Sequence, residues 1–354
     1  MYTSFLSLSA LLAAVLGSAT HHAPQCTESL VPITASATNF DLSSGSAPPN
    51  ATLPVSGTFD IHLRLCAPTV PVPSRARTLQ VLIHGASCNE EYWDSTFKPE
   101  TYSYVRHAAA QGYWTLNFAR LGDGESARPD GIDIVQVPFE VALVSEIIKL
   151  ARAGRLPGEH SSFEKVVILG HSFGSITLNN IVATAPDLVD AAIFTGFAHT
   201  FGPTDPITVA KFGPARDIDP RFADLPPAYL TTLNASTRAA AFYGAPDSYE
   251  PDALAWDEAH KDTTTTGEVL TFQGGAAAEA PSFTGDVFTI NGDADGIFCT
   301  KPGCANLADE AKFYPAARSA EFAVIPGAGH SVNFHIAAPA AYGAIQRWLN
   351  EHGY

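Results

Sequence analysis

Ser172 lies between two glycines, where an apolar segment gives way to a segment of helical character. Residues 170–174 read GHSFG, directly after the apolar run 166–169. A G-x-S-x-G pattern between a strand and a helix is typical of a nucleophile on a sharp turn, which lifts the hydroxyl off the sheet so that a base can reach it. The helix N-terminus also directs free N–H groups at any oxyanion formed there. The pattern predicts a nucleophilic serine, although a structural turn uses the same residue types.

A serine nucleophile needs a histidine base, and the histidine needs an acid that orients it. His330 ends the segment FAVIPGAGH, so a loop after this expected strand can carry its imidazole to the sheet edge that holds Ser172. Asp293 and Asp295 follow another expected strand, in TINGDADGIF. Either carboxylate can form a turn beside a glycine. We favour Asp295 as the acid, because it stands farther beyond the strand end, where its side chain can turn toward the next loop.

Short apolar segments alternate with helical segments along most of the chain. The expected strands include TLQVLIHG, YWTLNF, KVVILG, AAIFTGFA and DVFTING. This alternation predicts a parallel sheet with helices on both faces. The alternation breaks over residues 200–282, which are rich in Pro, Gly and aromatic residues and too long for a plain loop. We expect a mostly helical cap there, between two parts of a core at 20–199 and 283–354.

Five motifs, in this order, resemble those of the α/β-hydrolase family. They are LIHGAS (82–87), ARLGDGES (119–126), GHSFGS, NGDADGIF and GAGHS. They span about residues 79–350, and the chain order Ser172, Asp295, His330 is the order found in that family. The resemblance implies an α/β-hydrolase fold: a mostly parallel, eight-stranded sheet with helices on both faces and a cap inserted before the acid strand. The layout also resembles that of secreted fungal α/β-hydrolases, some of them linked to secondary metabolism.

The same resemblance implies an oxyanion hole built from the backbone N–H groups of Phe173 and Ala86. We expect the substrate pocket to be bordered by the His-Gly turn and by cap aromatics, namely His84, Gly85, Tyr243 and Trp256. Epoxide hydrolases and dehalogenases of this fold use aspartate as the nucleophile. A serine at that position favours acyl chemistry instead.

The expected function is hydrolysis of a carboxylic ester or lactone, with no metal and no cofactor. Acyl transfer to an alcohol or amine on the same three residues is one alternative. A hydrolase fold kept as a small-molecule binding protein is another. The identity of the substrate and the oligomeric state stay open at this point.

The N-terminus predicts secretion. Residues 5–16 form an apolar run of signal-peptide length, followed by the small residues 17–19, so we expect a signal peptide over residues 1–19. Asn50 and Asn234 stand in N-glycosylation sequons. Five cysteines fit an oxidising compartment, and their spacing does not resemble a zinc site. Cys299 and Cys304 can close a short loop and Cys26 can pair with Cys66, which leaves Cys88, but the connectivity stays open.

The net charge excludes one class of function. With 36 acidic against 20 basic residues, the formal charge is −16, and Lys and Arg form no cluster in the sequence. A nucleic-acid backbone would be repelled. No segment beyond the N-terminal one is apolar over the length of a membrane span. The expected partner is therefore a small-molecule substrate.

Overall fold

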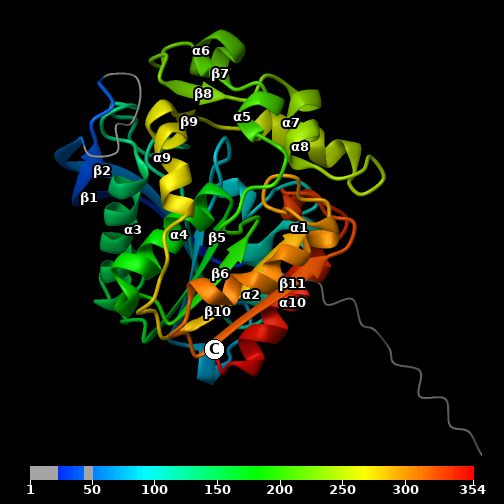
Figure 1. The fold of residues 1–354 in the computed structure, drawn as a ribbon. Coiled ribbons are helices and arrows are strands. Elements are labelled where there is room, and N and C mark those ends of the chain that lie inside the picture. The colour runs from blue at the N-terminus through cyan, green and yellow to red at the C-terminus, as the bar shows by residue number, and fades with distance from the viewer. Residues whose placement is uncertain (1–22, 44–50) are drawn as a thin grey trace, which may run out of the picture.

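The core of the molecule is an eight-stranded sheet. The computed structural model describes residues 23–43 and 51–354 and has the strand order β1-β2-β4-β3-β5-β6-β10-β11. The strands are β1 (Cys26–Phe40), β2 (Thr52–Cys66), β3 (Thr78–Ile83), β4 (Trp114–Phe118), β5 (Lys165–His171), β6 (Ala191–Thr195), β10 (Asp286–Gly292) and β11 (Ser319–Ile325). β2 pairs antiparallel with β1 and β4, and every other neighbouring pair is parallel. The predicted mostly parallel sheet is confirmed (Figure 1).

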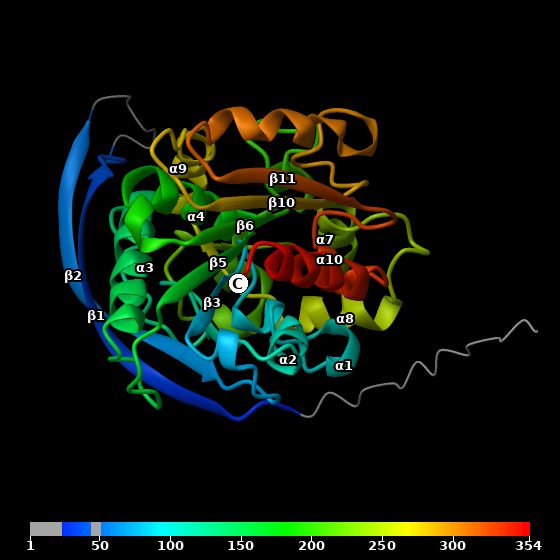
Figure 2. The same ribbon diagram turned by 90° about the horizontal axis from the view of Figure 1, so that it is seen from below.

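Helices cover both faces of this sheet. The helices of the core are α1 (Pro99–Tyr102), α2 (Tyr104–Ala110), α3 (Val137–Arg152), α4 (Phe173–Thr184) and α10 (Ala338–Glu351), with a long 3-10 segment, η5 (Pro302–Phe313). α3 and α4 contact each other on one face, and α2 and α10 contact each other on the other (Figure 2). Strands covered on both sides must be apolar along their whole length, which is why β3 is buried at all of its residues.

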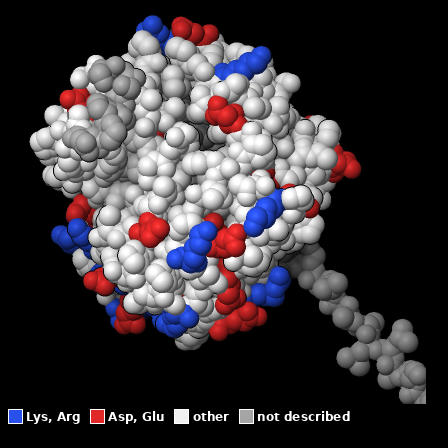
Figure 3. Space-filling model, viewed as in Figure 1, with Lys and Arg blue, Asp and Glu red and all other residues white. Residues whose placement is uncertain are grey.

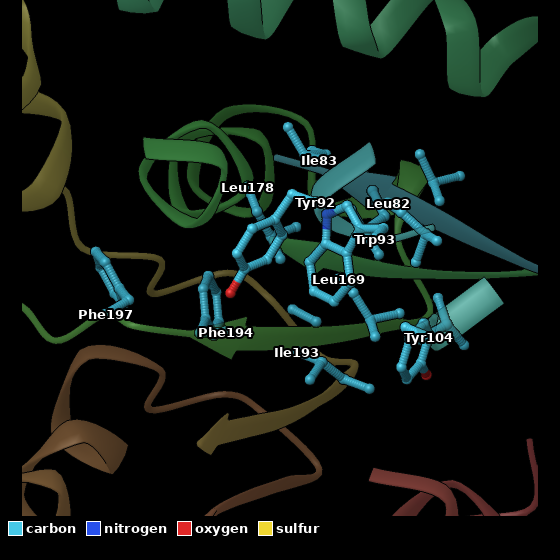
Figure 4. Close-up of a cluster of buried hydrophobic side chains, with 14 of the residues drawn as sticks. Leu82, Ile83, Tyr92, Trp93, Tyr104, Leu169, Leu178, Ile193, Phe194 and Phe197 are labelled. Atoms are coloured by element: carbon cyan, nitrogen blue, oxygen red, sulfur yellow. The ribbon is translucent and has the colours of Figure 1, made fainter. Parts of the chain in front are cut away.

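Aromatic and aliphatic side chains fill the space between the central strands and the helices. Figure 4 shows part of this core, in which aliphatic residues of β3, β5 and β6 pack with aromatic ones. The labelled members of that cluster include Leu82, Leu169, Ile193, Tyr92, Trp93 and Phe194. This rigid core holds the strand ends from which the candidate site is built.

The insertion between β6 and β10 forms a cap. It contains α5 (Pro206–Val209), α6 (Ala215–Ile218), α7 (Ala235–Phe242), α8 (Pro251–His260) and α9 (Thr266–Ala276), and a small antiparallel sheet of β7 (Gly213–Pro214), β8 (Tyr229–Thr231) and β9 (Thr264–Thr265). Most of the cap lies above the sheet in Figure 1, and α9 returns along α4 and α3. The cap is therefore mostly helical, with a three-stranded sheet that the sequence did not indicate.

Two disulfides brace the described part of the chain. Cys26 and Cys66 are bonded at directly paired positions of β1 and β2, and Cys299 is bonded to Cys304 in the loop after β10. Cys88 is a buried free thiol. The segment expected to be a signal peptide and the sequon at Asn50 lie outside the described residues.

Among the residues that the structure describes, no helix is both long enough and apolar enough to cross a membrane. On the face seen in Figure 3, Lys and Arg side chains stand apart from one another among acidic ones. This distribution agrees with the acidic balance of the sequence.

Candidate active site

Ser172 occupies a strained turn between β5 and α4. Its backbone has φ 52° and ψ −115°, a region that non-glycine residues enter only at an energetic cost. Its N–H donates to the carbonyl of Thr195 at 2.9 Å, which ties the turn to β6. Strain of this kind is maintained when the surrounding structure requires one particular side-chain direction. The predicted strand–turn–helix context of Ser172 is present.

Close backbone contacts explain the two glycines of the motif. A Cβ atom on Gly174 would lie 2.3 Å from the carbonyl oxygen of Ile83, and one on Gly170 would lie 2.6 Å from the carbonyl oxygen of Gly174. Rotating a side chain cannot relieve contacts with backbone atoms. The glycines therefore allow the first turn of α4 to pack directly against the end of β3.

The structure brings His330 and Asp295 together from the loops that follow β11 and β10. Nδ1 of His330 lies 3.0 Å from Oδ2 of Asp295, and both side chains are buried. The other carboxylate oxygen accepts N–H groups of Ile297 at 2.9 Å and Phe298 at 3.2 Å. With Nδ1–H donating to Asp295, Nε2 of His330 is left as the proton-accepting nitrogen. This is the arrangement that a general base requires.

Asp293 has a different role. Its Oδ1 accepts the N–H of Gly327 at 2.9 Å, and this bond closes the turn between the loops after β10 and β11. The geometry therefore separates the two carboxylates that the sequence offered as alternatives.

Ser172 and His330 line one cavity between the core and the cap. It encloses about 660 Å³ of empty space, part of it open to solvent. The lining side chains leave little room between them, so the cavity is narrow. None of its lining residues is Asp, Glu, Lys or Arg. The apolar lining residues are Ala86, Cys88, Phe173, Ile176, Phe201, Pro206, Ile207, Phe212, Phe242, Val269, Phe272, Ile297 and Phe298.

The backbone of Gly85 and Ala86 passes directly beside Ser172. A Cβ on Gly85 would lie 3.1 Å from Cβ of Ser172, a tighter contact than most Cβ atoms make, so glycine favours this approach. Ala86 and Phe173 both line the cavity together with Ser172. Their positions suit the two backbone N–H donors that the resemblance implies.

His84 does not line the cavity, contrary to expectation. It is fully buried, its Nδ1 donates to the carbonyl of Gly85 at 2.9 Å, and its Nε2 accepts the N–H of Arg120 at 3.0 Å. Burial, aided by the nearby Arg120 charge, holds the pKa of His84 well below its usual value. A neutral His84 therefore braces the turn.

Tyr243 and Trp256 are also absent from the cavity lining. The hydroxyl of Tyr243 donates to Asp257 at 2.8 Å, which turns the ring toward a buried ion pair inside the cap. Trp256 stacks on His260 one helical turn later, with ring centroids 4.1 Å apart. The cap aromatics that line the cavity are other residues, among them Phe242 and Phe272.

A buried arginine lies behind Phe173. The guanidinium of Arg120 is 4.5 Å from the centroid of that ring and is ion-paired with Glu268 of α9 and with Asp123. Glu140 lies 3.9 Å away, and burial raises its pKa to about 8. Three carboxyl groups thus share one buried cation, and burial favours the protonated form of Glu140. No feature of the sequence pointed to this cluster.

Two buried histidines near the site are also neutral. His171 stacks on Tyr92, with ring centroids 4.2 Å apart, and burial holds its pKa well below the usual value. Burial likewise lowers the pKa of His335 to about 4. Among the described residues, no group of three or more His, Cys, Asp or Glu side chains is arranged to hold a metal ion.

Comparison with known proteins places the chain in a family. Residues 80–344 match the model of the "Alpha/beta hydrolase family". None of the curated proteins matches the sequence at a significant level.

Solved structures share this fold at low sequence identity. An esterase from Thermogutta terrifontis superposes with a TM-score of 0.57 at 16% identity, over 92% of this chain and all of that one. A monoglyceride lipase variant from Saccharomyces cerevisiae gives 0.56 at 16% identity, over 94% of this chain and 96% of the other. A monoacylglycerol lipase from Paleococcus ferrophilus gives 0.55 at 18% identity, over 82% of this chain and 99% of the other. The matched segment, the sheet order and the strained serine turn agree, and the chain belongs to the alpha/beta hydrolase family.

Proposed function

We propose that the protein is a serine hydrolase that cleaves neutral carboxylic esters or lactones with apolar acyl groups. One observation carries this proposal: Ser172, on its strained turn, and His330, paired with Asp295, line the same narrow apolar cavity. Structural neighbours that are named esterases and lipases support the same class of reaction.

The proposed reaction begins when Oγ of Ser172 attacks the substrate carbonyl and Nε2 of His330 takes the hydroxyl proton. Asp295 stabilises the resulting imidazolium through Nδ1–H. The N–H groups of Phe173 and Ala86 bind the oxyanion. Collapse of the tetrahedral intermediate breaks the bond to the alcohol oxygen, which takes the proton from His330. Water then attacks the acyl-enzyme by the same steps and releases the acid and Ser172.

The cavity lining supports a neutral substrate. A charged acyl group would lose its water shell among phenylalanine and aliphatic side chains, with no opposite charge in the lining. We expect monosuccinate esters to be cleaved at least about 100-fold more slowly than butyrate esters of the same alcohol, because burying an unpaired charge costs several kcal/mol. Equal rates would contradict the assignment of this cavity to the acyl group.

The direct test compares Ser172→Ala with Ser175→Ala. Ser175 is a buried serine of the same helix whose hydroxyl donates to the carbonyl of Thr195, so it is a matched control. We expect Ser172→Ala to lose both hydrolysis of p-nitrophenyl butyrate and labelling by a fluorophosphonate, while Ser175→Ala keeps both. Undiminished hydrolysis by Ser172→Ala would overturn the proposal.

Acyl transfer is the second candidate function. A narrow, apolar cavity restricts the access of water to the acyl-enzyme, and this favours attack by another acceptor. Adding alcohols or amines and measuring the transferred acyl product by mass spectrometry separates the two reactions. Stoichiometric labelling of Ser172 without turnover of any ester or lactone would instead support the binding-protein alternative.

We further propose that the protein is secreted after removal of residues 1–19 and carries glycans at Asn50 and Asn234. Asn234 is exposed at the N-terminus of α7, and two disulfides fit an oxidising compartment. A role in fungal secondary metabolism rests on the sequence resemblance alone. N-terminal sequencing and glycosidase treatment of the exported protein test the first two points.

A further inference from the structure

A buried ion pair of the cap contacts the loop that carries Ala86. Arg238 of α7 is fully buried and pairs with Asp257 of α8 through two bonds, Nε to Oδ2 and Nη2 to Oδ1, each 2.7 Å long. A third donor, Nη1, reaches Oγ of Ser87 at 2.9 Å. The pair therefore joins two cap helices to the residue that follows Ala86 in the chain.

All five N–H donors of the guanidinium have an acceptor. Besides the bonds to Asp257 and Ser87, Nη1 lies 3.4 Å from Oγ1 of Thr232, and Nη2 lies 3.5 Å from Sγ of Cys88. Five donors in a rigid, planar arrangement define the position of each acceptor, and an ammonium group cannot reproduce this pattern. The guanidinium thus holds two successive loop residues, Ser87 and Cys88, against the cap.

Ser87 is bound to the cap at each of its polar groups. Its N–H donates to the carbonyl of Thr263 at 2.9 Å, and its carbonyl accepts the N–H of Asp262 at 3.2 Å. Its φ of 55° is unfavourable for a residue with a side chain, so these bonds must hold it there. Because Ser87 is bonded directly to Ala86, anchoring Ser87 fixes one end of the short segment that carries the N–H of Ala86, which lies in the peptide between Gly85 and Ala86.

We propose that Arg238 is a positioning residue for the oxyanion hole: through Ser87 it orients the backbone N–H of Ala86 toward the reacting carbonyl. The inference rests on the proposed function, because it needs an oxyanion at Ser172. Under this proposal, the cap covers the cavity and also helps to position an oxyanion donor. An N–H that points away from the oxyanion stabilises the transition state less, while the binding of substrate, which lies in the apolar part of the cavity, changes little.

The test uses Ser87→Ala, which removes only the loop side of the contact, with Thr232→Val as its matched control. Thr232→Val removes a hydrogen bond to the same Nη1 but leaves the bond between Nη1 and Ser87 in place. We expect Ser87→Ala to lower kcat for p-nitrophenyl butyrate by about 10-fold or more at unchanged KM, since losing one oxyanion donor outright costs about 10²–10³-fold. Binding of a phenylboronic acid, whose adduct with Ser172 is tetrahedral and anionic, should weaken by a similar factor. Thr232→Val should leave both values near those of the wild type.

A second variant removes the ion pair without leaving a buried charge. Arg238→Met combined with Asp257→Leu replaces both partners by apolar side chains, which folded proteins tolerate better than loss of one partner. We expect the same loss of kcat and of boronate affinity as for Ser87→Ala, and no further loss when all three changes are combined.

The outcomes separate this inference from the proposed function. If wild-type turnover is abolished by Ser172→Ala, but Ser87→Ala and the double variant keep the kcat and boronate affinity of Thr232→Val, the positioning role is wrong and the proposed function stands. If ester turnover survives Ser172→Ala, or the wild type neither turns over esters nor binds the boronate, both are overturned.

Discussion

The carboxylate of Asp295 lies 3.0 Å from Nδ1 of His330, in a site where both side chains are buried. In the described part of the loop after β10, Asp293 instead accepts a backbone N–H from Gly327. We therefore expect Asp295→Asn to lower kcat by about 10²–10⁴-fold, because an amide no longer holds the imidazole in the reactive tautomer. Asp293→Asn, the matched control, should change kcat by less than about 3-fold. Steady-state kinetics on p-nitrophenyl butyrate measure kcat for both variants. A larger loss of kcat in Asp293→Asn than in Asp295→Asn would assign the role of the acid to Asp293.

Gly196 leaves room for the imidazole of His330. Its φ is +55°, and a Cβ atom there would lie 2.9 Å from Cε1 of both His171 and His330. We expect Gly196→Ala to lower kcat by at least about 10-fold, since a displacement of about 1 Å in a catalytic group has effects of this size. Gly353→Ala introduces a side chain at a similar φ of +76° with nothing within 4 Å, so it controls for backbone strain. Equal activity of the two variants would show that His330 is not displaced.

Cap aromatics that line the cavity should set acyl-chain preference. Phe272 of α9 contacts Phe201 edge to face, with ring centroids 5.5 Å apart, and both line the cavity. We expect Phe272→Ala to lengthen the space and raise kcat/KM for octanoate relative to acetate esters by about 10-fold, the effect of one or two buried methylene groups. Trp256→Ala, outside this cavity, should leave the ranking unchanged. A changed ranking only in Trp256→Ala would place the acyl pocket elsewhere.

Neutral His335 should make stability depend on pH in a defined range. Its Nε2 accepts the N–H groups of Gly244 and Gly329, each at 3.0 Å, and burial lowers its pKa to about 4. The unfolded chain takes up a proton near pH 6.5 but the folded chain does not, so stability is full above this pH and falls as the pH drops toward 4. This contributes roughly 1.4 kcal/mol of unfolding free energy per pH unit within that range.

The measurement for His335 is urea unfolding at several pH values between 4 and 7. His335→Gln should be less stable throughout, yet its unfolding free energy should depend less steeply on pH than that of the wild type. His160→Gln, an exposed control, should keep the wild-type slope. Parallel pH profiles for the wild type and His335→Gln would contradict a neutral His335.

For Glu140 we expect the opposite dependence of the unfolding free energy on pH. Burial raises its pKa to about 8, so the folded state keeps a proton that the unfolded chain loses near pH 4.5. Its contribution to stability is complete below that value and is lost as the pH rises toward 8. Glu140→Gln should remove this loss, so that stability relative to the wild type increases from pH 5 to 8. Glu146→Gln, on the exposed side of the same helix, is the control, and identical pH profiles would refute a protonated Glu140.

Features that depend on residues close together in the chain could be predicted from the amino-acid sequence. The turn at Ser172 was predictable because an apolar strand, two glycines and a helix follow one another within a few positions. His330 and Asp295 were predictable as candidates because the ends of parallel strands meet at one edge of a sheet. The cap was recognisable from the break in alternation between β6 and β10.

The contacts between the cap and the core could be known only from the folded chain. Which aromatic side chains face the cavity depends on how α7, α8 and α9 are rotated against the sheet, and this rotation is set by contacts between distant segments. Tyr243 and Trp256 carry suitable rings but point to partners within the cap, Asp257 and His260. Arg238 and Ser87 are 151 residues apart in the chain, so no local pattern relates them. Their contact exists because folding removes both from water, where a buried guanidinium must find an acceptor for every N–H it carries.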